Sequence, residues 1–82
     1  MKLYGYADAG LPPEEVAPVA LAEITLCATP QELRDMSKFL ADCADEMVRM
    51  GSTYDHVHLS DRFKQFESSP HVVVAPAEGG VA

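Results

Sequence analysis

The chain has 82 residues, which is enough for one small domain, and it carries 13 acidic against 6 basic side chains for a formal net charge of −7. This balance argues against nucleic acid as a partner, because a nucleic-acid surface requires an excess of Lys and Arg. No apolar run approaches the roughly 20 residues that cross a bilayer, and the N-terminus lacks the order of a secretory signal, so we expect a cytoplasmic protein without membrane contact.

Two strands are predicted at the start of the chain, separated by a long loop. The sequence KLYGY at 2–6 is aromatic and alternating, which is typical of a strand. Residues 7–20 contain three prolines and a glycine, which break any regular period and indicate a loop. The sequence LAEITLCA at 21–28 alternates between an apolar face and a mixed face that carries Cys27, and we expect the apolar face to meet a helix.

A single long helix is predicted between Thr29 and Gly51. Thr29 suits the N-cap, Pro30 suits the first helical position, and Glu32 stands where a capping box needs an acid. Gly51 suits the left-handed residue that often ends a helix. Apolar side chains recur between these ends at three- and four-residue steps, so we expect this face to be buried. Its members are Leu33, Met36, Phe39, Leu40, Cys43, Ala44, Met47 and Val48.

Two further strands are predicted after the helix. In DHVHLSD at 55–61, apolar residues alternate with polar ones, which predicts a third strand with one polar face. Residues 62–70 contain two phenylalanines that suit a loop or a short helical turn at the edge of the domain. The valines of HVVVA at 71–75 favour a fourth strand. Residues 76–82 lack apolar periodicity, which predicts a flexible C-terminal tail.

The predicted order is β-β-α-β-β, an α+β two-layer domain over residues 1–75 in which one long helix packs on a mostly antiparallel four-stranded sheet. A helix is about 10 Å wide and covers only one face of such a sheet. We expect the other face to meet water, a second copy or another protein. Its predicted members are Tyr4, Tyr6, Thr25, Cys27, His56, His58 and Val73.

The strongest candidate for chemistry is the pair His56 and His58, with Asp61 nearby. Residues i and i+2 of a strand share a face, so two imidazoles and a carboxylate would suit a zinc-like ion. No further metal-ligand motif accompanies the pair, and polar residues on the wet side of a strand explain it better, so we expect no metal site. Cys27 and Cys43 are expected to be free thiols, and without a nucleophile motif or phosphate loop we expect neither catalysis nor a cofactor.

An acidic cluster stands out in the second half of the predicted helix. Asp42, Asp45 and Glu46 lie where negative charges oppose the helix dipole, and Asp55 follows just beyond the helix end. The cluster indicates either a surface that steers a basic partner or an ordinary solvated helix face. Aromatic residues expected to contribute binding energy beside such a surface are Tyr4, Tyr6 and Tyr54.

The segments LAEITLCATPQELRDMSKFLADCADEM, YDHVHLSD and SPHVVV resemble the immunity protein 32 family of bacterial polymorphic toxin systems. The resemblance covers most of residues 1–74 and implies a small α+β protein that binds and neutralises a cognate toxin without catalysis. A basic toxin domain, such as a nuclease, fits the negative charge of the chain. The alternatives are a small homodimeric domain with a structural or regulatory role, and a metal-dependent protein built on the histidine pair.

Overall fold

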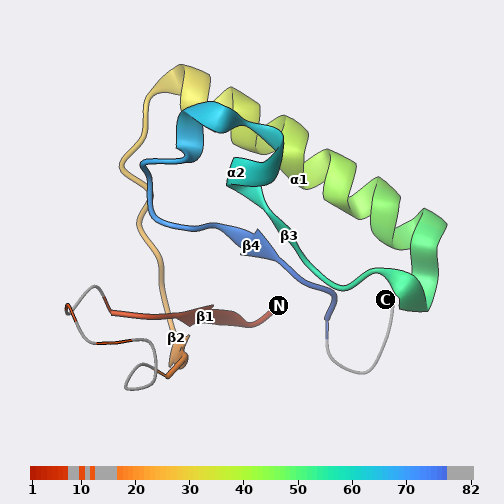
Figure 1. Ribbon diagram of the computed structural model, residues 1–82, viewed down its shortest axis with the longest axis horizontal. Coiled ribbons are helices and arrows are strands. Elements are labelled where there is room, and N and C mark those ends of the chain that lie inside the picture. Colours follow the sequence, from red (N-terminus) through yellow and green to blue (C-terminus); the bar gives the residue numbers. More distant parts are fainter. Residues whose placement is uncertain (8–9, 11, 13–16, 78–82) are drawn as a thin grey trace.

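The computed structural model describes residues 1–7, 10, 12 and 17–77, and Figure 1 shows the arrangement of their elements. β1 (Leu3–Gly5) pairs antiparallel with β2 (Val19–Leu21), and β3 (Val57–His58) pairs antiparallel with β4 (Val73–Val74). The predicted element order and the α+β class are confirmed. The prediction of one four-stranded sheet is wrong, because the described strands form two separate two-stranded sheets.

Helix α1 (Pro30–Met50) begins and ends where the sequence predicts. The backbone N–H of Glu32 donates to Oγ1 of Thr29 at 3.1 Å, and the backbone N–H of Thr29 donates to Oε1 of Glu32 at 2.8 Å, which completes the capping box. At the other end Gly51 has φ 56°, a conformation that favours glycine, and its N–H donates to the carbonyl of Met47. None of the helices in the described ranges combines the length and the apolar character needed to span a bilayer.

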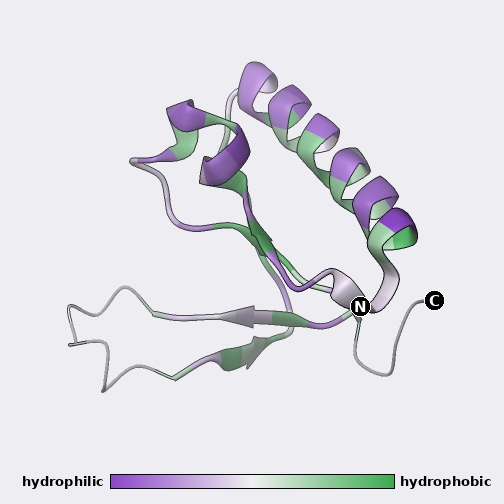
Figure 2. Ribbon diagram, turned by 45° about the vertical axis from the view of Figure 1, so that its right-hand side comes forward, coloured by the Kyte–Doolittle hydropathy of each residue, from purple (hydrophilic) through white to green (hydrophobic). Residues whose placement is uncertain are grey.

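The core lies between α1 and the segment that follows it. This segment contains a single 3-10 turn η2 (Gly51–Thr53), β3, the short helix α2 (Leu59–Arg62), a second 3-10 turn η3 (Lys64–Phe66) and β4. Of the two forms predicted for 62–70, a loop or a short helical turn, the structure shows the turn η3, and α2 begins earlier. Figure 2 shows α1 hydrophobic on the side that faces these elements and hydrophilic on the other. The buried residues are Phe39, Cys43, Tyr54, Leu59 and Phe66.

The strands are shorter than their sequence patterns predict. Only Leu21 of the predicted strand 21–28 belongs to β2, and the rest runs from the hairpin to α1 without pairing to another described strand (Figure 1). The third strand ends at His58, because Leu59 starts α2, where its carbonyl accepts from the backbone N–H of Phe63 at 3.0 Å. The predicted loop and tail fall partly on 8–9, 11, 13–16 and 78–82, which lie outside the described residues.

The β1–β2 hairpin lies on the opposite side of the molecule from α1 in both ribbon views (Figures 1 and 2). Its two strands contact each other more than they contact any other element. The radius of gyration is 13.9 Å, against about 12 Å for a compact domain of this length. The hairpin therefore extends the molecule and adds little to its core.

Candidate partner-binding surfaces

The acidic residues of α1 lie on its hydrophilic side, but two of them are already paired. Nζ of Lys38 donates to Oδ2 of Asp42 at 2.9 Å, one helical turn along α1. Arg62 of α2 donates to both carboxylate oxygens of Glu46, at 2.7 and 2.8 Å. Asp45 is exposed and forms no ion pair with a described residue. Among Asp42, Asp45 and Glu46, only Asp45 therefore has no ion pair with a described residue.

The bidentate contact between Glu46 and Arg62 joins α1 to α2. The hydrogen bonds from Arg62 hold the pKa of the Glu46 carboxyl below its ordinary value, and the same contact raises the pKa of the Arg62 guanidinium. The planar fork of an arginine fits a carboxylate in this way, which fixes geometry as well as charge. The sequence does not indicate this role of Arg62, because no local spacing connects two residues that lie sixteen positions apart. We infer that Glu46 has a structural role in addition to any contact with a partner.

Asp55 lies beyond the helix end, and its side chain is 88% exposed. One of its carboxylate oxygens contacts Nδ1 of His56. The structure therefore places Asp55 on the surface beside the histidine pair.

The three tyrosines fall into two groups. Tyr4 and Tyr6, in and just after β1, are 57% and 63% exposed, so their rings are available to a partner. Tyr54 is only 5% exposed, and its hydroxyl donates to the carbonyl of Val74 at 3.0 Å. Burial and a hydrogen bond with Cys43 raise the pKa of Tyr54 to about 12. Tyr54 thus belongs to the core, and the hairpin tyrosines lie away from the acidic side of α1.

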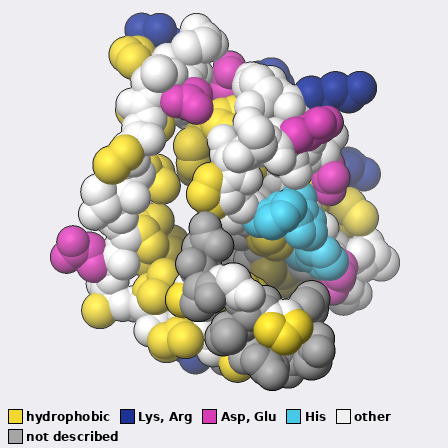
Figure 3. Space-filling view, turned by 60° about the vertical axis from the view of Figure 1, so that its left-hand side comes forward, with side chains coloured by type: hydrophobic (Ala, Val, Ile, Leu, Met, Phe, Trp, Pro, Cys, Tyr) yellow, Lys and Arg dark blue, Asp and Glu magenta, His cyan; other side chains and the backbone are white. Residues whose placement is uncertain are grey.

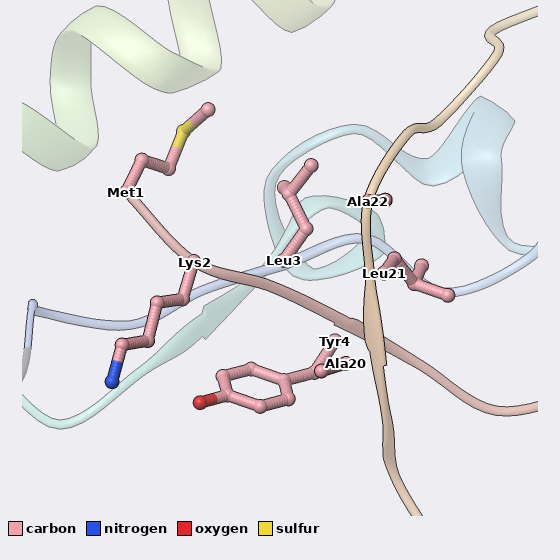
Figure 4. Close-up of a pocket in the computed structure, with 7 residues that line it drawn as sticks. All are labelled: Met1, Lys2, Leu3, Tyr4, Ala20, Leu21 and Ala22. Atoms are coloured by element: carbon pink, nitrogen blue, oxygen red, sulfur yellow. The ribbon is translucent and has the colours of Figure 1, made fainter.

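An open pocket of about 590 Å³ lies on the hairpin (Figure 4). Leu3 points to one side of β1 and the ring of Tyr4 points to the other, with Lys2 beside it. The sequence alternation of 2–6 predicts this division, but it does not predict that β2 completes the pocket wall. The lining residues are Met1, Lys2, Leu3, Tyr4, Ala20, Leu21 and Ala22.

The histidines form a surface group on the outer side of the β3–β4 sheet. The ring centroids of His56 and His58 lie 5.3 Å apart, and those of His58 and His71 lie 5.8 Å apart, both in edge-on arrangements. Nδ1 of His58 is 3.9 Å from a carboxylate oxygen of Asp61. Within the described ranges, no three His, Cys, Asp or Glu side chains are arranged to hold one metal ion. The sequence did not indicate that His71 would join the pair, because that requires the β3–β4 register.

Part of the apolar face predicted for α1 is exposed. Phe39 and Cys43 are each 1% exposed, but Leu33, Leu40 and Val48 are 47%, 51% and 79% exposed. At 100° per residue, Leu33 and Leu40 lie opposite Asp42 on the helix, whereas Val48 lies about 60° from Asp45. Hydrophobic side chains also gather in a band down the face shown in Figure 3, beside the histidines. The prediction that the whole stripe is buried is therefore wrong, because the small elements after α1 cover only its centre.

The two cysteines are free, as predicted, and they differ in environment. Cys43 is buried in the core, whereas Cys27 is exposed in the span between β2 and α1. No disulfide joins them, so the fold relies on packing, caps and the ion pair described above.

Comparison with known proteins adds one match to this description. No curated protein and no solved structure matches the chain. The family model named Immunity protein 32 matches residues 23–75, nearly two thirds of the sequence. The matched segment contains the span before α1 and then every described element from α1 to β4, while the β1–β2 hairpin lies outside it. The chain belongs to the immunity protein 32 family.

Proposed function

We propose that this chain is a bacterial immunity protein that binds a cognate toxin domain in the cytoplasm and neutralises it without catalysis. Membership of the immunity protein 32 family carries the proposal. The toxin belongs to a polymorphic toxin system, and its binding surface is basic. The net charge of −7 supports a basic partner, because opposite charges accelerate association.

The mechanism is occupation of a surface that the toxin needs. A nuclease fits this mechanism, because a site that binds phosphates is positively charged and attracts carboxylates that take the place of those phosphates. On this chain Asp42, Asp45 and Asp55 are the carboxylates that we propose as contacts, with Glu46 held in position by Arg62. When a cationic side chain of the toxin binds Asp42, the ion pair between Lys38 and Asp42 is broken or becomes a three-membered charge cluster.

The exposed tyrosines of the hairpin form a second proposed contact. Aromatic side chains such as Tyr4 and Tyr6 supply much of the binding energy of protein interfaces when a partner buries them. Since the hairpin and α1 lie on opposite sides of the molecule, the two surfaces are tested separately. Tyr54 is left out of this surface, because its ring and hydroxyl are used inside the fold.

Co-expression tests the function. The chain is expressed with the polymorphic toxin C-terminal domain encoded beside it, and both cell survival and co-purification are scored. We expect survival together with a stable complex. A folded chain that neither protects the cells nor co-purifies with the toxin would contradict the proposal.

Charge-neutral variants then test the acidic surface. The double variant Asp42→Asn, Asp45→Asn removes two charges from the outer side of α1, and the control Asp61→Asn, Glu67→Gln removes two exposed charges elsewhere. We expect the first variant to bind the toxin several-fold more slowly at low salt, with a weaker salt dependence, and the control to change both less. Equal association rates for the two variants would exclude this side of α1 as the steering surface.

A further inference from the structure

The span between β2 and α1 has an open backbone edge. Residues 23–28 form no backbone hydrogen bond with another described segment, and every one of them is exposed. Ile24 and Leu26 are 50% and 53% exposed, although both belong to the apolar face of a strand-like pattern. An unpaired strand edge with exposed apolar side chains is a template for pairing with another strand.

The sequence of this span is complementary to itself. Thr25 is the midpoint of the free span 22–28, so an antiparallel pairing centred there uses the whole span. In that register Ile24 lies opposite Leu26 of the second copy, and Glu23 lies opposite Cys27. The two Thr25 residues face each other on the symmetry axis, which is a favourable cross-strand pair. No like charges lie opposite one another, and a symmetric contact of this kind closes as a dimer.

The low charge of the span between β2 and α1 favours a second copy of this chain over a basic protein as its partner. The span carries a single charged residue, Glu23, although the whole chain has a net charge of −7. The exposed flank of α1 formed by Leu33, Leu40 and Val48 is uncharged. Two copies therefore meet with little repulsion here, whereas a basic partner gains more on the opposite, acidic side of the helix.

The size of the core gives a further reason for self-association. Only five hydrophobic residues are buried among those the structure describes, while Ile24, Leu26, Leu33 and Leu40 are each about half exposed. A domain of this length buries a smaller fraction of its surface than a larger domain does, and it gains stability when a second subunit covers its exposed apolar groups.

We propose that two copies of this chain form a symmetric homodimer in which residues 23–27 pair antiparallel about Thr25. The half-exposed side chains of Ile24 and Leu26 provide apolar surface that the dimer buries. The acidic side of α1 remains free, so the dimer does not depend on toxin binding and is tested without a toxin.

Solution mass gives the first test. Light scattering after size-exclusion chromatography is expected to give twice the chain mass of 8.9 kDa. The variant Thr25→Pro removes a backbone N–H that forms no hydrogen bond with another described segment, so we expect it to keep the helical circular dichroism signal and to elute as a monomer. The control is Gln31→Ala, which lies outside the span on the exposed side of the first turn of α1 and is expected to remain dimeric.

Cross-linking tests the register. In a Cys27→Ser background, Thr25→Cys places two thiols opposite each other at a separation that a disulfide spans, so an oxidant is expected to link the chains nearly completely. In the native chain the two Cys27 residues are offset by four positions, roughly 13 Å, and are expected to link poorly. Ser52→Cys in the same background is the exposed control and is also expected to link poorly.

Two results would overturn the proposal. One is a monomer mass for the native chain at several hundred micromolar. The other is a dimer that survives Thr25→Pro and in which Thr25→Cys links no faster than Ser52→Cys.

Discussion

Replacement of Tyr54 by Phe tests whether this tyrosine belongs to the core. The change removes one hydroxyl and leaves the ring, so the lost interaction is the 3.0 Å hydrogen bond to the carbonyl of Val74 in β4. A neutral hydrogen bond contributes about 0.5–1.5 kcal/mol, and we expect Tyr54→Phe to lower the free energy of unfolding by about 1 kcal/mol. For a domain of this size that loss lowers Tm by about 4–8 °C.

The assay is urea unfolding followed by far-ultraviolet circular dichroism at fixed protein concentration, because self-association makes stability concentration-dependent. The chain has no tryptophan, and tyrosine fluorescence would change with the substitution itself. Tyr4→Phe is the matched control: Tyr4 is 57% exposed, so we expect no change in the free energy of unfolding.

The same variant gives a test in alkali. The pKa of Tyr54 is raised from 10.0 to about 12, so the folded protein keeps the phenol proton in a range where the unfolded chain releases it. The stability that Tyr54 contributes is therefore present below pH 10 and declines between about pH 10 and 12. The stability difference between native chain and Tyr54→Phe is expected to shrink across this window. A variant equal in stability to the native chain at pH 7, or a difference that stays constant up to pH 12, would refute the assignment.

Three further changes address the helix and its contacts. Thr29→Ala removes the capping side chain and is expected to cost about 1 kcal/mol in urea unfolding, with Thr29→Ser restoring most of the loss. Phe39→Ala empties the centre of the core and is expected to cost about 3–5 kcal/mol, visible as loss of cooperative thermal unfolding; a cooperative transition at the native Tm would contradict this. The lowered pKa of Glu46 stabilises the fold above about pH 4.5, its ordinary value, and this contribution is lost as pH falls further, so Glu46→Gln is expected to flatten the acid limb of the stability profile.

The long helix could be predicted from the sequence because its signals are local. Thr29, Pro30, Glu32 and Gly51 act within one turn of their own positions, and the structure shows each in the expected role. The centre of the buried face also follows from periodicity, as Phe39 and Cys43 show.

The sheet could not be predicted to the same degree, because pairing depends on partners far away in the chain. The alternation in 21–28 is typical of a strand, but β1 extends only over Leu3–Gly5, so β2 ends at Leu21 and the rest of the pattern has no neighbour among the described strands. Leu59 fits the sequence pattern of a strand, but in the structure its carbonyl accepts from the backbone N–H of Phe63 and it begins α2.

The candidate surfaces were also predictable only where the property depends on the residue itself and not on a distant partner. The exposure of Asp45, Asp55, Tyr4 and Tyr6 agrees with expectations drawn from residue type, whereas the partners of paired residues do not follow from spacing. The carboxylate of Glu46 accepts hydrogen bonds from Arg62 of α2, and the ring of Tyr54 is buried in the core.

Because Cys27 is exposed and Cys43 is buried, thiol labelling of the unmodified protein reports on two different events. Cys27 reacts with a thiol reagent at a rate set by its access to solvent. A dimer that pairs through residues 23–27 would slow this reaction as the protein concentration rises. Cys43 reacts only when α1 separates from the elements packed on it. Labelling at the two sites, resolved by mass, therefore separates dissociation of the copies from unfolding of each one in a single experiment.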